Sequence, residues 1–367
     1  MAHRGDPCSE KANPMSVSKG MTVRQFIDEM GKSHAFNAGR LYDAAKVYEK
    51  MLKDDCLVVM TLAGAMVPAG LGRIIADMVR SNRVDVVCAT GANIYHDVQA
   101  ALGFPFYKGS WNVDDEALRK VRVDRIYDIY VREDDFVELD AFLIKSIFPS
   151  LSKSLRKDGA STAEFHFELG KALGEKVEGR DSFIVQAAKR GVPVFCPSPG
   201  DSAIGMGICA YNYKNTKSQI NINIARDVMQ FSALVYCSKK TGGIEVGGGA
   251  PKNYFMQTQI MLEQNLGLSK RGHDFFVQIT TDAPHWGGLS GATPQEAVSW
   301  GKVKGHQKNY SVVYSDATIA LPLMAAYVSD LEKRDGRRLC LKLENCERKL
   351  LEAAKKVKGS NFNLSKE

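Results

Sequence analysis

The run Cys-Leu-Val-Val-Met-Thr at residues 56–61 begins the pattern that decides the fold. A helical pattern over 70–80 follows it, and a second apolar run, Val-Asp-Val-Val-Cys at 84–88, precedes a helical pattern over 94–102. Short apolar strands that alternate with amphipathic helices are typical of βαβ units and a parallel sheet. The pattern therefore predicts an α/β fold that is doubly wound, with a mainly parallel sheet and helices on both faces.

The alternation continues along the chain. Further apolar runs of strand length lie at 192–195, 243–246, 274–281 and 310–314, with helices expected at 181–189, 220–238 and 316–331. The segment 103–160 is less regular, apart from a helical pattern over 135–151. No internal repeat and no linker interrupts the pattern. We therefore expect one domain over 21–335, a disordered or arm segment at 1–20, and a solvated, basic, helical tail at 336–367.

Turns rich in small residues follow three of the predicted strands. They are Leu-Ala-Gly-Ala-Met at 62–66, Thr-Gly-Ala-Asn at 90–93 and Gly-Gly-Gly at 247–249. Ligands of doubly wound sheets bind outside the carboxyl ends of the strands. The three glycines let backbone amides approach an anion at a helix N-terminus, so they are the best phosphate-binding candidate. Tight strand-to-helix turns are the alternative, since the Gly-x-Gly-x-x-Gly fingerprint is absent.

The segment Ser-Gly-Ala-Thr-Pro-Gln-Glu-Ala-Val-Ser-Trp-Gly-Lys at 290–302 presents an acid, an indole and an amine within seven residues. Thr293 is expected to cap a short helix, with Glu296 as the acid of a capping box. Glu296 and Trp300 then share one helix face, and Lys302 follows where a loop can aim it into a pocket. The alternative is a capped surface helix with a solvated lysine.

Composition excludes several classes of protein. No apolar run approaches the eighteen or so residues of a membrane span, and the first residues lack the apolar core of a signal peptide, so a cytoplasmic enzyme is expected. The net charge of +7 is spread thinly and partly gathered in the tail, without a basic patch interleaved with aromatics, so nucleic-acid binding is not expected. Eight cysteines without a Cys-x-x-Cys pair predict buried thiols and no metal site.

Five motifs resemble those of the deoxyhypusine synthase family. The most specific is Glu-Ala-Val-Ser-Trp-Gly-Lys at 296–302. The others, in the family's order, are Val-Asp-Val-Val-Cys-Ala-Thr-Gly-Ala (84–92), Gly-Val-Pro-Val-Phe-Cys-Pro (191–197), Gly-Gly-Gly-Ala-Pro-Lys (247–252) and Val-Val-Tyr-Ser-Asp-Ala (312–317). The resemblance implies a Rossmann-like, NAD-binding fold and a homotetramer.

The resemblance also implies a reaction. Enzymes of this family use NAD to oxidise the secondary amine of the polyamine spermidine, and a lysine captures the aminobutyl fragment as an imine. The fragment then passes to an acceptor amine. For deoxyhypusine synthase the acceptor is a lysine of the hypusine-carrying translation factor, and for the homospermidine synthases derived from it the acceptor is putrescine.

By resemblance, Lys302 is the imine-forming lysine, and it must be uncharged to react. Trp300 matches the family's stacking residue, whose π face suits a cationic amine, and Glu296 matches an acid of the substrate pocket. Further substrate-binding candidates are His96, Asn253 and Ser290. The cofactor-binding candidates are Thr90, Gly91, Ala92, Asp201, Gly248, Thr281, Asp282, Asp316 and Ala317. Asp201 is also expected to cap the next helix, and a helix cap is the alternative role of Asp316.

The chain departs from the family in the amine pocket. Tyr95-His96 stands where the family has paired glutamates, Asn253 replaces a histidine, and Met206 and Leu289 align with two aspartates. Burying an unpaired ammonium group costs several kcal/mol, so loss of these acids argues against spermidine bound in the family's pose.

Three hypotheses follow. The first is an NAD-dependent transferase of the same kind with an altered amine donor or acceptor. The second is a true deoxyhypusine or homospermidine synthase in which Asp97, Asp201, Asp282 and Glu296 replace the missing acids. The third is an inactive paralogue that regulates an active partner. The first two differ in the number of carboxylates that a tetramer places within hydrogen-bond reach of the space beside Lys302: two or more favour the second, and none or one favours the first.

Overall fold

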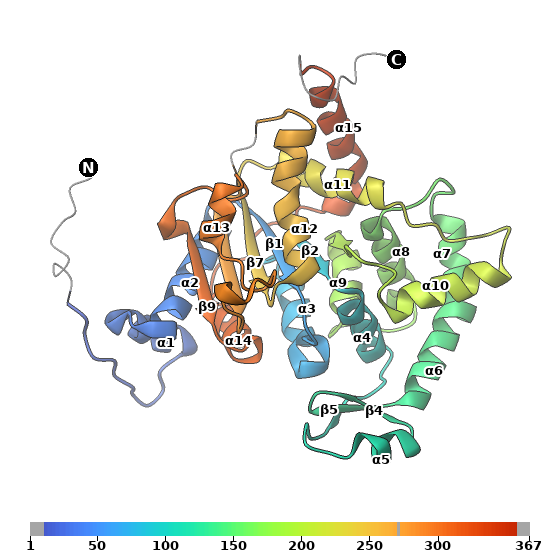
Figure 1. Cartoon of the computed structure of the whole chain (residues 1–367), viewed down its shortest axis with the longest axis horizontal. Coiled ribbons are helices and arrows are strands. Elements are labelled where there is room, and N and C mark those ends of the chain that lie inside the picture. The colour runs from blue at the N-terminus through green and yellow to red at the C-terminus, as the bar shows by residue number, and fades with distance from the viewer. Residues whose placement is uncertain (1–10, 270–271, 358–367) are drawn as a thin grey trace.

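The computed structural model describes residues 11–269 and 272–357, and a six-stranded sheet lies at its centre (Figure 1). The strand order is β6-β2-β1-β7-β8-β9, and every neighbouring pair is parallel. The strands are β1 (Leu57–Leu62), β2 (Val86–Ala89), β6 (Val194–Phe195), β7 (Thr241–Val246), β8 (Phe275–Thr280) and β9 (Tyr310–Tyr314). This confirms the predicted α/β, doubly wound fold.

The central strands β1, β7 and β8 are buried along their whole length because helices cover both faces of the sheet. All six residues of β1 are buried. Val58, Met60 and Leu62 belong to one core layer, whereas Leu57 and Val59 belong to the other. The alternation along the strand thus divides a single hydrophobic run between two cores.

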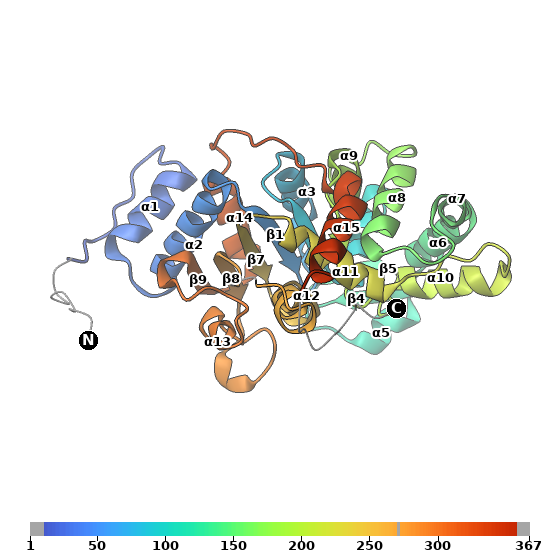
Figure 2. The ribbon, with the colours of Figure 1, turned by 90° about the horizontal axis from the view of Figure 1, so that it is seen from above.

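The two faces have different helices. One core layer contains α2 (Phe36–Lys53), α3 (Gly72–Arg80), α4 (Gly91–Ala101), α8 (Thr162–Gly174), α9 (Phe183–Arg190) and α14 (Ala317–Tyr327). The other contains α11 (Ile224–Tyr236), α12 (Gly249–Ile260) and α15 (Leu343–Ala354). Figure 2 shows α12 and α3 on opposite sides of β1 and β7. Shorter helical turns lie at Val67–Leu71, Leu143–Ile147, Met261–Asn265, Pro284–Trp286, Gln307–Asn309 and Leu339–Lys342.

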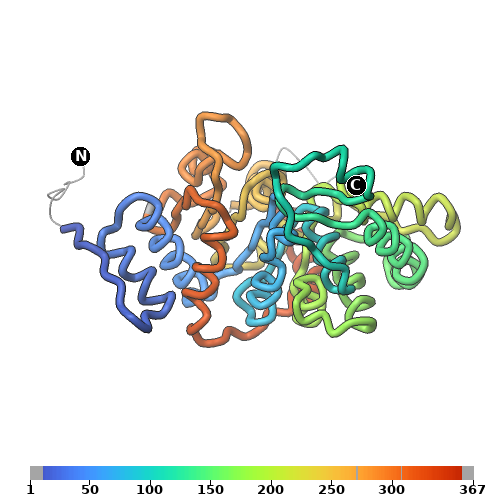
Figure 3. Tube along the Cα trace, turned by 90° about the horizontal axis from the view of Figure 1, so that it is seen from below, coloured from blue at the N-terminus to red at the C-terminus, as the bar shows by residue number. Residues whose placement is uncertain are grey.

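The segment between α4 and α8 contains a second, small sheet that the sequence did not predict. Its antiparallel strands, in the order β3-β5-β4, are β3 (Tyr107–Lys108), β4 (Val123–Ile126) and β5 (Ile129–Arg132), with α5 (Asp115–Lys120) beside them. Figure 1 shows β4, β5 and α5 below the main sheet, and Figure 3 shows the same teal segment in front. The helices α6 (Glu133–Phe142), α7 (Phe148–Ser154) and α10 (Ala203–Lys214) follow along the chain.

The two ends of the described chain contact the domain. Asn13 donates its backbone N–H to Lys32 of α1 (Val23–Ser33), and Ser16 donates to Glu29. The tail helix α15 exists as predicted, but the expectation that it is solvated was wrong, because Leu343, Cys346, Leu350 and Ala354 are buried. The parts of the predicted arm and tail at 1–10 and 358–367 lie outside the described residues.

Among the described residues, no helix is long and apolar enough to span a bilayer. No group of His, Cys, Asp and Glu side chains in residues 11–269 and 272–357 is arranged to hold a metal ion. The buried thiols include Cys56, Cys88, Cys196 and Cys346, whereas Cys209 and Cys237 are exposed.

Candidate active site

A small pocket of about 180 Å³ forms around Lys302. Its lining comes from α12, from the loop after β8 and from α13 (Pro294–Ser299): Lys252, Asn253, Met256, Leu289, Ala292, Thr293, Glu296, Ala297, Trp300 and Lys302. The structure therefore brings together four of the candidates, Glu296, Trp300, Asn253 and Lys302. The solvated-lysine alternative does not describe this side chain, which is half-buried in the pocket.

The turn after α13 holds Lys302 by its backbone. Thr293 caps α13 by accepting a hydrogen bond from the N–H of Glu296 at 3.3 Å, as predicted, and Gly301 ends the turn with a φ of 69°. The N–H of Lys302 donates to the carbonyl of Ala297 at 3.0 Å, and its carbonyl accepts from the N–H of His273 at 2.8 Å. Both backbone groups are thus satisfied, which leaves the side chain to project from a fixed turn.

Three side chains act on the amine of Lys302. Its Nζ lies 5.2 Å from the centroid of the Trp300 indole, and 59% of Trp300 is exposed. Burial lowers the pKa of Lys302 below its ordinary value, the carboxylate of Glu296 opposes this effect, and the ammonium of Lys252 adds to it. A larger fraction of neutral amine is the state that a nucleophilic lysine needs.

A buried polar layer lies beneath this pocket. Glu245 of β7 is paired in register with Thr61 of β1 and Gln278 of β8, so these side chains share one face of the sheet. Lys252, in the first turn of α12, reaches 3.7 Å from a carboxylate oxygen of Glu245 and also donates to the carbonyl of Ala292. Lys252 was not singled out as a site residue from the sequence, although it ends the motif Gly-Gly-Gly-Ala-Pro-Lys at 247–252.

The crevice at the reversal of the sheet lies beside the same helix. From β1 the chain winds outward to β2 and β6, whereas from β7 it winds to β8 and β9, so the switch point lies between β1 and β7. Gly247 follows β7 with a φ of 79°, and a Cβ there would lie 2.9 Å from the carbonyl of Ala63. Only glycine fits this close approach of the two strand ends.

Two helix N-termini beside the switch point have no side-chain cap. One is α12, whose N-cap is Gly248, and the other is α4, whose N-cap is Thr90. The first N–H groups of such helices have no intrahelical partner and favour an anion. These termini fit the phosphates of a dinucleotide, and Gly91 and Ala92 open the second of them.

Ser290 and Asp282 join the glycine turn to the Lys302 loop. A Cβ on Gly248 would lie 2.3 Å from the Cα of Ser290, so these two backbones touch. The hydroxyl of Ser290 donates to the carboxylate of Asp282, and its carbonyl accepts from the amide of Gln278 at 2.7 Å. Ser290 therefore lies between the cofactor candidates and the pocket of Lys302 without lining that pocket.

The remaining cofactor candidates lie at other strand ends. Asp201 lies next to Gly91, where a Cβ would be 3.5 Å from the carbonyl of Asp201. Its predicted role as a helix cap was wrong, since Ser202 caps α10 by accepting from Gly205. Thr281 directly follows β8 and is exposed.

After β9, Asp316 caps α14 and Ala317 begins that helix. All of these cofactor candidates thus follow strand ends at the carboxyl edge of the sheet. From β6 to β9 this edge spans five strand spacings, roughly 24 Å.

Two positions of the family's lost acids lie outside the Lys302 pocket. His96 of α4 packs against the rings of Phe106 and Phe136, and burial lowers the pKa of its imidazole. Met206 lies on α10 and is 65% exposed. Among the residues that line the pocket in the described chain, one lies at such a position, Leu289, and Asn253 lies where the family has a histidine; both are uncharged.

Asp97 is excluded as a replacement acid. It is fully buried and accepts hydrogen bonds from the Ser182 hydroxyl at 2.6 Å and from the backbone N–H groups of Phe183 and Ile184 at 2.9 and 3.0 Å. The carboxylate of Asp97 therefore accepts the hydrogen bonds of the first residues of α9.

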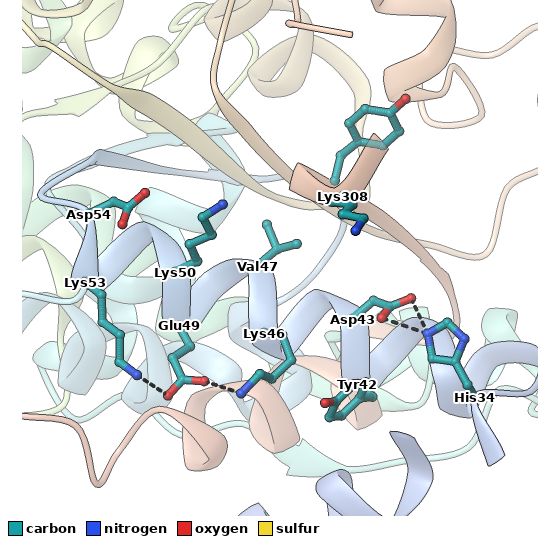
Figure 4. Close-up of a pocket in the computed structure, with 11 residues that line it drawn as sticks. His34, Tyr42, Asp43, Lys46, Val47, Glu49, Lys50, Lys53, Asp54 and Lys308 are labelled. Carbon is teal, nitrogen blue, oxygen red and sulfur yellow. Dashed lines mark hydrogen bonds and ion pairs between the residues drawn. The ribbon is translucent and has the colours of Figure 1, made fainter. Parts of the chain in front are cut away.

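A larger hollow, of about 660 Å³, lies along α2 (Figure 4). Its acidic side chains already have partners: Glu49 pairs with Lys46 and Lys53, and Asp43 bonds to the imidazole of His34. Glu49 is buried and also pairs with Arg24, so its charge is balanced within the protein, whereas the Asp43–His34 contact is exposed. Size alone therefore does not make this hollow the active site.

Comparison with known proteins shows the family of this chain. The model of the deoxyhypusine synthase family matches residues 25–328. "Probable deoxyhypusine synthase 1" of Archaeoglobus fulgidus is 41% identical over 86% of this chain and 96% of its own. "Probable deoxyhypusine synthase 2" of Methanosarcina acetivorans is 40% identical over 85% of this chain and 88% of its own. The "deoxyhypusine synthase-like protein" of a Nostoc species is 40% identical over 87% of this chain and 84% of its own.

The fold has a solved counterpart. The crystal structure of a "putative deoxyhypusine synthase from Entamoeba histolytica" superposes with a TM-score of 0.58 at 16% identity, and covers 89% of this chain and 99% of its own. Fold and family define an α/β protein of the transferase class, with a half-buried lysine in a pocket against α12. The chain belongs to the deoxyhypusine synthase family.

Proposed function

We propose that this protein is an NAD-dependent transferase that moves an alkylamine group, of the aminobutyl type, through an imine on Lys302 to an acceptor amine. One observation carries the proposal: Lys302, Trp300 and Glu296 line one pocket, and α12, which forms part of its wall, begins uncapped at the switch point. NAD, when bound, supplies the hydride acceptor for oxidation of the donor amine. The uncapped helix ends and the glycine turn would hold its phosphates.

The residues of the pocket have distinct proposed roles. Trp300 stacks on the alkyl and ammonium groups of the donor, and Glu296 pairs with an ammonium group. Lys302 in its neutral form attacks the oxidised carbon, a C–N bond forms, and the leaving amine departs with a proton. Attack by the acceptor amine on the Lys302 imine then releases the lysine and leaves the fragment joined to the acceptor as an imine. The NADH formed from the donor would supply the hydride that reduces this imine to the product amine.

The proposed amine donor or acceptor differs from those of deoxyhypusine synthase. Glu296 is the single carboxylate among the residues that line the pocket in the described chain. A polyamine with several ammonium groups needs several partners, since each unpaired buried charge costs several kcal/mol. A donor or acceptor that places one ammonium group in this pocket matches the single negative charge of Glu296. Spermidine with the translation-factor lysine is the alternative, and family membership also supports a homotetramer.

An amine panel tests this proposal. Purified protein is incubated with NAD and mono-, di- and polyamines, while NADH absorbance and borohydride-trapped adducts on Lys302 are followed. We expect an adduct with amines that carry few charges and little with spermidine. Absence of both NADH and adduct with every amine would contradict the proposal and favour the regulatory paralogue.

Asp316 tests the cofactor site separately. NAD at a hundred times its dissociation constant contributes about 2.7 kcal/mol to a folded state that alone binds it, so the melting temperature rises. The carboxylate of Asp316 accepts from the N–H of Thr318 at 2.7 Å, and loss of this cap costs about 1 kcal/mol. We expect Asp316→Ala to lower the melting temperature and also to reduce the shift caused by NAD.

Asp114→Ala is the matched control, because Asp114 caps α5 through the N–H groups of Glu116 and Ala117 at 2.9 and 3.1 Å and lies outside the candidate site. This variant should keep the whole NAD shift. If Asp316→Ala also keeps the whole NAD shift, the carboxylate of Asp316 only caps α14.

A further inference from the structure

The buried pair of Glu245 and Lys252 has no evident role in folding. Glu245 is completely buried, and Lys252 is 5% exposed. Their 3.7 Å contact is long, and among the described residues neither carboxylate oxygen of Glu245 has a hydrogen-bond partner. Buried charges with so few partners destabilise a fold compared with apolar side chains of the same size. Burial raises the pKa of Glu245 to about 8, although Lys252 opposes this effect.

The position of Lys252 is set by three structural features. Its backbone lies in the first turn of α12, its Nζ faces Glu245 on the sheet, and the same Nζ donates to the carbonyl of Ala292 in the loop that leads to α13. From this position Lys252 lines the same 180 Å³ pocket as Lys302. Two ammonium groups around one small pocket repel each other, and the one with fewer partners loses its proton first.

We propose that Lys252, anchored by Glu245 and Ala292, is a positioning residue that acts together with the burial of Lys302 to favour its unprotonated and therefore nucleophilic amine. This inference rests on the proposed role of Lys302 as the imine-forming residue. It assigns Lys252 no contact with the reacting carbon. A neighbouring cation is a known means of activating an amine nucleophile.

The other charges around Lys302 do not replace Lys252. Glu296 of α13 acts in the opposite direction, because a carboxylate favours the ammonium form. Glu263 lies near Gly301, where a Cβ would be 3.4 Å from its carboxylate, and it is exposed and also negative. Lys304 is paired with Asp274 and does not line the pocket. Lys252 is therefore the one cation among the described pocket-lining residues that can favour the neutral form of Lys302.

The test measures the reactivity of Lys302 without NAD or an amine substrate. The full-length protein is incubated with butanal and cyanoborohydride between pH 6 and 10. The Lys302 amine adds to the aldehyde carbon, water leaves, and hydride from cyanoborohydride reduces the imine to a stable secondary amine. Peptide mass spectrometry then gives the rate of labelling at Lys302 at each pH.

We expect the midpoint of Lys302 labelling to move upward by on the order of one pH unit in Lys252→Met, with a roughly tenfold slower rate near neutral pH. The double variant Lys252→Met/Glu245→Gln leaves no unpaired buried charge, and it should show the same upward shift. The control Lys304→Met removes one positive charge outside the pocket, and its midpoint should stay at the parent value.

Several results would overturn the inference: no label on Lys302 in the parent protein, an unchanged midpoint in folded Lys252→Met, or an equal shift in Lys304→Met. If neither Lys252→Met nor Lys252→Met/Glu245→Gln folds, Lys252 is a structural residue, and this result would also overturn the inference. The proposed function is tested apart from this, because labelling by butanal needs no transfer. If Lys252→Met shows the shift but the parent transfers no amine of the panel, the proposed function alone is refuted. If the parent transfers an amine but Lys252→Met shows no shift, the proposed role of Lys252 alone is refuted.

Discussion

Lys302→Arg is expected to eliminate borohydride-trapped adduct while the fold and NAD binding remain. A guanidinium group stays protonated and cannot attack the oxidised donor. With the covalent route removed, transfer should fall by several orders of magnitude. Loss of a hydrogen bond to a charged group would cost only about 1.5 to 3 kcal/mol, or roughly ten- to a hundred-fold in rate. Initial NADH formation can survive in this variant, because oxidation of the donor precedes capture.

Lys304→Arg is the matched control for this experiment. Lys304 lies two residues further along, is ion-paired with Asp274 and does not line the pocket, so its conservative replacement should leave transfer near the parent rate. If Lys302→Arg transfers the group within tenfold of the parent, Lys302 is not the nucleophile. The pocket would then bind the amine without reacting with it.

Asp97→Ala is expected to lower the free energy of unfolding by about 3 kcal/mol or more. The substitution removes the acceptor for the Ser182 hydroxyl and for two N–H groups that begin α9, all inside the core. Urea denaturation measures the loss. Asp181→Ala is the control, since Asp181 is exposed and pairs with exposed Arg73 at 3.2 Å, and such a pair is worth about 0 to 1 kcal/mol. Full stability of Asp97→Ala together with loss of transfer would return Asp97 to the list of substrate acids.

The parallel sheet was predictable because its strands are simple. Most of these strands are short, largely apolar runs between helices, so the pattern along the chain is enough to find β1, β2, β6, β7, β8 and β9. The small antiparallel sheet was missed because its strands have two to four residues and lie partly in solvent. In β4, for instance, Val123 and Ile126 flank Asp124 and Arg125, and none of the four is fully buried. Such a strand has no periodic signal.

The candidate site was predictable where the chemistry is local in sequence. Glu296, Trp300 and Lys302 lie within one helix and the turn after it, so their convergence follows from helix geometry. Lys252 and Glu245 were not predictable, because a lysine in the first turn of a helix is usually exposed and only the tertiary packing buries this one. The isolation of His96 among aromatic rings also depends on the segment 103–160, whose structure the sequence left open.

The loop between β8 and β9 has a consequence for how new specificities arise in this fold. Residues 281–309 leave one strand and return to its direct neighbour, and they carry the acid, the indole and the amine of the pocket. Its anchors include Ser290 on Gly248 and Gln278 and Ala292 on Lys252. The backbones of Lys302 and Lys304 bond to His273, Lys304 pairs with Asp274, and Ala297 and Val303 pack in the core. We therefore expect a graft that keeps these anchors to transfer the choice of amine to another scaffold without altering the order of its strands.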